Sequence, residues 1–132
     1  MPPCGRANEL QPSGSRGWLY LAGFLTLAGL VHFVAPRVYR PLIPDRLGNP
    51  DPWVYGSGAA EMAVGAALVP RRTRRPAAIA AAVMFVGVFP GNLQMAWDAR
   101  SSGTALRQLA TLTRLPFQGV LIWWALRVAA RS

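Results

Sequence analysis

The chain has 132 residues, which is enough for a single domain. Hydrophobic residues make up 52% of it and charged residues only 14%, whereas about a quarter of the residues in a soluble domain are charged, so the composition argues against a water-soluble protein. The net charge is +9, and all 14 basic residues are arginines that lie mostly between apolar blocks. This distribution is typical of membrane-protein loops and argues against a nucleic-acid-binding protein, which needs a clustered basic face.

The chain begins with a polar tail that is followed by an apolar block. Residues 1–16 are rich in proline, glycine and serine and show no periodicity, so we expect a disordered tail. Cys4 in this tail is the single cysteine, which excludes an internal disulfide and a cysteine-based metal site. Residues 17–35 are uncharged apart from His32 when it is protonated. At ~1.5 Å per residue their length matches the hydrocarbon core of a bilayer, which predicts a first transmembrane helix.

A proline-rich segment separates the first apolar block from the second. Residues 36–52 contain five prolines, and because a helix cannot continue through that spacing, we expect a loop. Residues 53–69 are mainly apolar or small and carry one carboxylate, Glu61. They form the predicted second span. Residues 70–76 read PRRTRRP, and four arginines within this stretch indicate a short cationic loop.

The second half of the chain contains two further apolar blocks. Residues 77–97 form the third, and Pro90 within it is expected to kink the helix. Residues 98–114 are polar and predict a connector, and residues 115–130 form the fourth block, with Pro116 suited to a helix start. The predicted fold class is therefore all-α, a four-transmembrane-helix bundle that occupies residues 17–132.

The arginines predict the orientation of this bundle. Membrane proteins place their short basic loops in the cytoplasm, so residues 70–76 are expected on the inner side. With four spans, both termini are then cytoplasmic, and the expected location is the bacterial inner membrane.

Glu61 is the residue around which the expected bundle is organised. A carboxylate is costly in lipid, so Glu61 should face protein partners, a cavity or a ligand. Ser57, Gly58 and Gly65 lie on the same side of a helix as Glu61. Because this face is otherwise small, a neighbouring helix can approach it closely and leave room beside the carboxylate.

Polar residues of the other predicted spans fall at a common depth near the outer surface, and Glu61 lies about 12 Å below them. We expect a polar pocket in which Glu61 and His32 form a catalytic proton relay. The amides and one hydroxyl are candidates for binding a quinone-like or sulfur-containing molecule: Ser57, Asn92, Gln94 and Gln118. The alternative is that each polar side chain only stabilises helix packing.

Four segments resemble, in the same order, the four blocks of DoxX-family bacterial membrane proteins. They are GLVHFVAPRVYRPLIP, SGAAEMAVGAALVPRRTR, VFPGNLQMA and RLPFQGVLIWWA. The resemblance implies a four-helix inner-membrane protein. Some DoxX relatives are the membrane subunit of thiosulfate:quinone oxidoreductase, and others belong to complexes that handle thiol and oxidative stress. Positions matching the polar residues that recur in this family are His32, Glu61, Asn92 and Gln118.

The functional hypothesis from the sequence is a subunit or accessory of a quinone-linked or thiol-related oxidoreductase system, and at most a membrane subunit of such an enzyme. It implies no metal or covalent cofactor, a quinone as ligand, and the bilayer and a membrane or peripheral redox protein as partners. Homo-oligomerisation stays open, and no nucleic acid is expected. The alternatives are a small-solute or proton-coupled transporter and a non-catalytic anchor or assembly factor, in which residues 70–76 would bind a partner or anionic lipid.

Overall fold

The computed structural model describes residues 16–132, with the side chain of Ser102 excepted, and this part of the chain contains helices and no strand. The all-α class is therefore confirmed. The predicted disordered tail, apart from Arg16, and Cys4 lie outside the described residues. The elements in chain order are α1 (Gly17–Val34), η1 (Pro36–Val38), η2 (Arg40–Leu42), η3 (Asp45–Leu47), α2 (Asp51–Ala67), α3 (Arg71–Ser102) and α4 (Ala105–Ala130).

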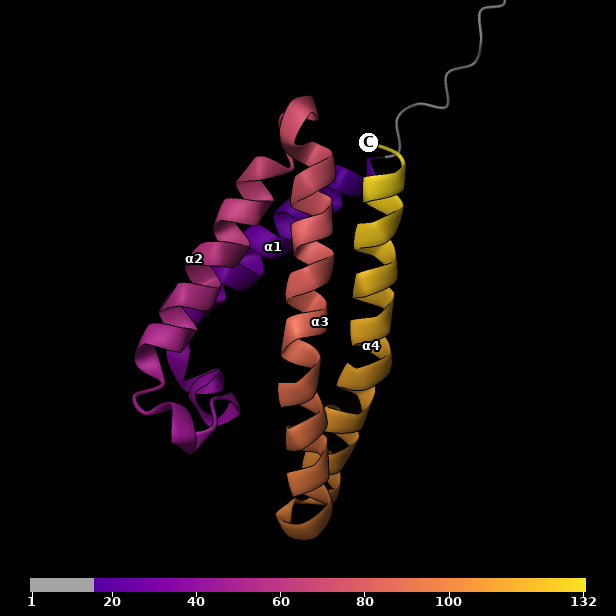
Figure 1. Ribbon diagram of the computed structural model, residues 1–132. Coiled ribbons are helices and arrows are strands. Elements are labelled where there is room, and N and C mark those ends of the chain that lie inside the picture. The colour runs from indigo at the N-terminus through magenta and orange to yellow at the C-terminus, as the bar shows by residue number, and fades with distance from the viewer. Residues whose placement is uncertain (1–15) are drawn as a thin grey trace, which may run out of the picture.

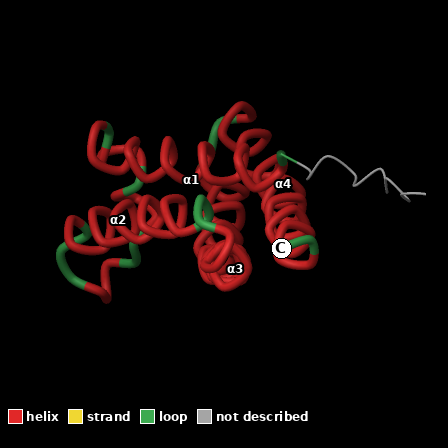
Figure 2. Tube along the Cα trace, turned by 90° about the horizontal axis from the view of Figure 1, so that it is seen from above, coloured by secondary structure: helices red, strands yellow, loops and turns green. Residues whose placement is uncertain are grey.

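The helices form two antiparallel pairs. α1 packs mainly on α2, and α3 packs mainly on α4, with smaller contacts between α2 and α3 and between α1 and α4. The start of α1, the α2–α3 turn and the C-terminus lie at one end of the molecule, and the α3–α4 turn lies at the other (Figure 1). Figure 2 shows α3 and α4 nearly end-on while α1 and α2 run across the view, so the two pairs are inclined to each other.

Glycines bring the backbones of α1 and α2 into contact. A Cβ added at Gly29 would lie 2.6 Å from the carbonyl oxygen of Gly58, and one added at Gly58 would lie 2.8 Å from that of Gly29. One helical turn beyond Glu61, a Cβ at Gly65 would lie 3.1 Å from the carbonyl oxygen of Ala22. The small face predicted for the second apolar block is thus confirmed, and it packs against α1.

Alanines on α3 allow a similarly close approach to the core. Six alanines of this helix are buried, and four of them belong to the main core, Ala77, Ala78, Ala81 and Ala82. Phe24 of α1 lies between the rings of Phe85 and Trp124, with ring centroids 6.4 Å apart in each case. These aromatic contacts join α1 to the α3–α4 pair around the fully buried Leu21 and Leu25.

Arg74 ties three helices together. Its Nε donates to the carbonyl oxygen of Leu68 at 2.9 Å and its Nη2 donates to that of Val69 at 2.8 Å, which satisfies acceptors at the end of α2. Its guanidinium also lies 3.9 Å from the centre of the Trp18 ring. One of the four arginines in the cationic segment is therefore a structural clamp, while Arg71, Arg72 and Arg75 are exposed.

Three predicted boundaries are wrong, because polar and proline-containing segments continue as helix. The segment 70–76 is the beginning of α3, which starts at Arg71. The polar connector predicted at 98–114 is helical except at residues 103–104, where Thr104 caps α4 by accepting a hydrogen bond from the Arg107 backbone N–H at 3.3 Å. Pro116, which was expected at a helix start, lies inside α4. Pro90 lies inside α3, as predicted. The polar residues of these segments lie mostly on the exposed face of a helix, and they do not mark a loop.

Two of the described helical segments are long and apolar enough to cross a membrane, Gly17–Val34 and Arg71–Ser101. They correspond to the first and third predicted spans. α2 has 17 residues, one fewer than the shortest helix counted as able to cross a membrane.

We predict that Gly58→Ala lowers the stability of the fold by about 1–3 kcal/mol, because the new methyl group overpacks a backbone contact. Gly56→Ala is the matched control on the same helix, since a Cβ there meets nothing within 4 Å. The measurement is the thermal unfolding midpoint in detergent followed by circular dichroism. Equal midpoints for the two variants would contradict the glycine contact.

Candidate functional site

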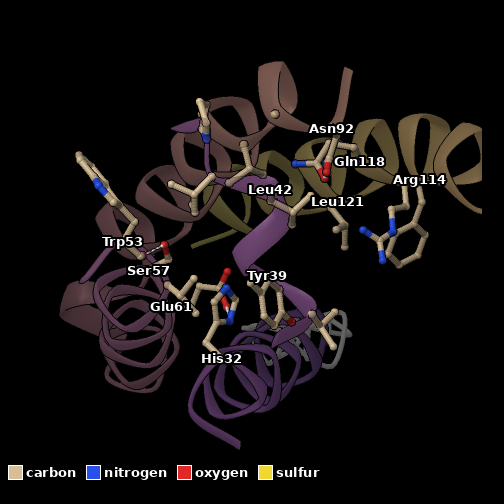
Figure 3. A pocket seen from close by; sticks show the side chains of 18 of the residues that line it. His32, Tyr39, Leu42, Trp53, Ser57, Glu61, Asn92, Arg114, Gln118 and Leu121 are labelled. Carbon is tan, nitrogen blue, oxygen red and sulfur yellow. Dashed lines mark hydrogen bonds and ion pairs between the residues drawn. The ribbon is translucent and has the colours of Figure 1, made fainter. Parts of the chain in front are cut away.

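A cavity of about 570 Å³ lies between the two helix pairs. Its wall is mostly apolar, with contributions from Phe24, Leu42, Val54 and Leu121. Seven polar side chains also line it: His32, Tyr39, Ser57, Glu61, Asn92, Arg114 and Gln118 (Figure 3). Cavities of this size and mixed lining are typical of small-molecule sites.

Glu61 and His32 meet at the α1–α2 contact. Oε2 of Glu61 lies 3.5 Å from Nδ1 of His32. Nδ1 is also 2.8 Å from the carbonyl oxygen of Ala28, and because a carbonyl only accepts, this hydrogen bond places a proton on Nδ1. Oε2 of Glu61 is buried and has no hydrogen-bond donor among residues 16–132. The predicted pairing of the acid and the histidine therefore agrees with the structure, and one carboxylate oxygen is left with unused acceptor capacity.

Tyr39 covers the histidine, which the sequence did not indicate. Its ring stacks on that of His32, with centroids 3.6 Å apart and planes at 16°. Burial raises the pKa of the Tyr39 phenol above its usual value of 10.0, the negative charge of Glu61 raises it further, and Arg114 lowers it. Tyr39 is thus within the electrostatic reach of both the acid and the arginine.

Asn92 and Gln118 connect α3 to α4 on the cavity wall. Nδ2 of Asn92 donates to Oε1 of Gln118 at 3.2 Å, and Nε2 of Gln118 donates to the carbonyl oxygen of Phe85. Both residues were predicted to bind a ligand, and both line the cavity. In the structure they hydrogen-bond to each other, and Gln118 also bonds to the backbone of α3. This is the helix-packing role that the sequence analysis gave as the alternative.

Ser57 and Gln94, the other two predicted ligand-binding residues, differ in position. Ser57 lines the cavity, and its hydroxyl donates to the carbonyl oxygen of Trp53 one turn earlier at 2.5 Å. Gln94 does not line the cavity; its side chain is exposed and donates to Oδ1 of Asp98 at 3.1 Å. Residues two apart on a helix point in different directions, so Asn92 and Gln94 could not both face the cavity.

Arg114 is a further cavity residue that sequence reasoning missed. It was assigned to a loop at the end of the polar connector. Because α4 already begins at Ala105, Arg114 lies one helical turn before Gln118 and shares its face. The spacing of four residues between these two side chains was the available signal, and it depended on recognising the connector as helix.

The segment between α1 and α2 closes one side of the cavity. Val38, Leu42 and Ile43 line the cavity from this segment. Nε of Arg40 lies 2.6 Å from Oδ1 of Asp51, which ties the segment to the start of α2. Among the described residues, no group of three or more His, Cys, Asp or Glu side chains is arranged to hold a metal ion.

A family model described as "Domain of unknown function (DUF8561)" matches residues 21–129. The chain belongs to the DUF8561 family. The DUF8561 match includes every residue named above as lining the cavity. No match was found among curated proteins or solved structures. The likeness to DoxX proteins stays a prediction.

Proposed function

We propose that this DUF8561 protein is a four-helix protein of the bacterial inner membrane, and that its cavity binds a quinone-like molecule with which Glu61 and His32 exchange protons. The supporting observation is the buried Oε2 of Glu61, which lacks a donor in the described chain and lines a largely apolar cavity beside His32. In this proposal the protein is a membrane subunit or accessory of an oxidoreductase system. The electrons come from a partner protein.

The outer surface supports lipid as the solvent of all four helices. Large apolar or aromatic side chains are exposed on each of them, for example Leu27, Tyr55, Val83 and Val120. Soluble monomers rarely expose apolar patches of such extent. The acid and the histidine lie on the inside, which is the arrangement expected of ionisable groups in a membrane protein.

The proposed orientation places the start of α1, the α2–α3 turn and the C-terminus in the cytoplasm. Arg71, Arg72 and Arg75 are exposed at that end, as the positive-inside rule requires. α3 has 32 residues, and a helix of that length is about 48 Å long, whereas the hydrocarbon core is about 30 Å thick. The α3–α4 turn then extends out of the membrane on the outer side.

We predict opposite accessibilities for cysteines placed at Ser101 and Ser132 in a Cys4→Ser background. A membrane-impermeant maleimide added to intact spheroplasts should label the Ser101→Cys protein at once. It should label the Ser132→Cys protein only after the membrane is permeabilised. The reverse pattern, or labelling of both from outside, would reject the proposed topology.

The chemistry of a quinone fits the lining of the cavity. A quinone has a flat apolar ring with two acceptor oxygens, and its quinol form has two hydroxyl donors. Conversion of one into the other requires two electrons and two protons. One quinol hydroxyl can donate to Oε2 of Glu61, which has no other donor among the described residues, and pass its proton to this carboxylate as the two electrons go to the partner protein. The second hydroxyl, at the opposite edge of the ring, releases its proton to water. Leu42, Val54 and Leu121 supply apolar contact for the ring.

We predict that Glu61→Gln weakens the binding of 1,4-naphthoquinol by about tenfold, because a hydrogen bond to a carboxylate is replaced by one to a neutral amide. The readout is quenching of tryptophan fluorescence in detergent, since Trp53 lines the cavity. Gln94→Leu is the control, because Gln94 lies outside the cavity. It should bind as the unmodified protein does and also corrects for partition of the ligand into detergent.

Two results would reject the proposed function. One is the absence of saturable binding of either 1,4-naphthoquinone or its quinol to the unmodified protein. The other is an unchanged quinol affinity in the Glu61→Gln protein, which would show that the buried carboxylate does not contact the ligand.

A further inference from the structure

Arg114 is the arginine of the described chain that lines the cavity. Arg114 takes no part in the two ion pairs seen among residues 16–132, which join His32 to Glu61 and Arg40 to Asp51. Its Nη1 lies 4.0 Å from the sulfur of Met95, which is a weak hydrogen-bond acceptor. Arg114 is an exposed residue, so its guanidinium is accessible to a ligand in the cavity.

Three other arginines of the described chain are engaged within the protein. Arg74 bonds to two backbone carbonyls at the end of α2. Arg100 and Arg127 lie over the rings of Trp97 and Trp123, at 5.4 Å and 5.1 Å from the ring centres. Arg114 has neither an aromatic partner nor a backbone acceptor in the described chain, and it is the one of these four arginines that lines the cavity.

The polar groups of the cavity are divided between two sides. Figure 3 shows Arg114 near Asn92 and Gln118, while His32, Glu61 and Tyr39 lie together across the cavity, with Leu42 and Leu121 between the two groups. Arg114 lies on α4 and Glu61 on α2, so the two charges are held on different helix pairs. A ligand that satisfies both sides has an apolar ring in the middle, a hydrogen-bond donor or acceptor at one edge and an acidic group at the other.

The geometry points to Arg114 as an anion-binding residue, so that the cavity selects quinone-like molecules carrying a negatively charged substituent over neutral ones. This inference rests on the proposed function and adds the ligand class. A guanidinium binds a carboxylate or sulfonate through two parallel hydrogen bonds, which gives both affinity and a fixed orientation. The neutral amides of Asn92 and Gln118 beside it are already hydrogen-bonded to each other. Arg114 is therefore the group on this side of the cavity that can pair with a negative charge on the ligand.

The test compares two probes of the same ring, 1,4-naphthoquinone and 1,4-naphthoquinone-2-sulfonate. The unmodified protein in detergent should bind the sulfonate at least about tenfold more tightly than the neutral quinone, the range expected of a charge-assisted pair. Arg114→Gln should remove this preference and keep the affinity for the neutral quinone, which also shows that the variant is folded. Arg107→Gln, an exposed arginine of the same helix that does not line the cavity, should behave as the unmodified protein does.

Two further experiments test whether the positive charge causes the preference for the sulfonate. One keeps a cationic side chain at position 114, and the other leaves the protein unmodified. Arg114→Lys should retain part of the preference, and raising the salt concentration should reduce it in the unmodified protein because mobile ions screen the charge at the cavity wall. If the neutral quinone binds but the sulfonate has no advantage, or if Arg107→Gln lowers that advantage as much as Arg114→Gln, the inference is overturned and the proposed function stands. If neither probe binds to the unmodified protein, both fail.

Discussion

The backbone contact between α1 and α2 is the constraint on which the rest of the structure depends. Gly29 and Gly58 allow the two helices to meet without intervening side chains, and this contact brings Glu61 to within 3.5 Å of His32. A larger residue at either glycine would separate the helices and leave the carboxylate without its neighbour. The ring of Tyr39 stacked on His32 then completes the polar side of the cavity.

The sequence was informative where a helical period linked small and polar residues. Glu61, Gly58 and Gly65 share one face of any helix, so their common orientation followed from spacing alone, and the cost of a charge in lipid indicated that this face points inward. The all-α class followed from the apolar blocks, and the cavity positions of His32, Asn92 and Gln118 followed from their common depth in the predicted spans. The hydrogen-bond partner of each amide could not be predicted in this way, because it depends on the distance between α3 and α4.

The errors arose where local polarity was taken as a sign of a loop. Residues 98–114 are polar, yet α3 and α4 pack against each other along most of their length and continue through this segment. Assigning it to a loop placed Arg114 outside any helix and hid its alignment with Gln118. Gln94 was placed in the pocket because it lies at the same depth as Asn92, but depth in a membrane does not decide the direction of a side chain. The sequence predicted that Glu61 and His32 would lie near each other. It could not predict which atoms meet or how far apart they are.

The central claim is that the acid of α2 faces the histidine of α1 inside the protein and not the lipid. His32 is the only histidine in the chain, so nitrogen NMR of histidine-labelled protein reports on this contact alone. The account predicts an imidazole that carries a proton on Nδ1, and an imidazole nitrogen spectrum that changes in the Glu61→Gln protein but not in the Gln94→Leu protein. An imidazole spectrum that is identical with and without the carboxylate would contradict the account.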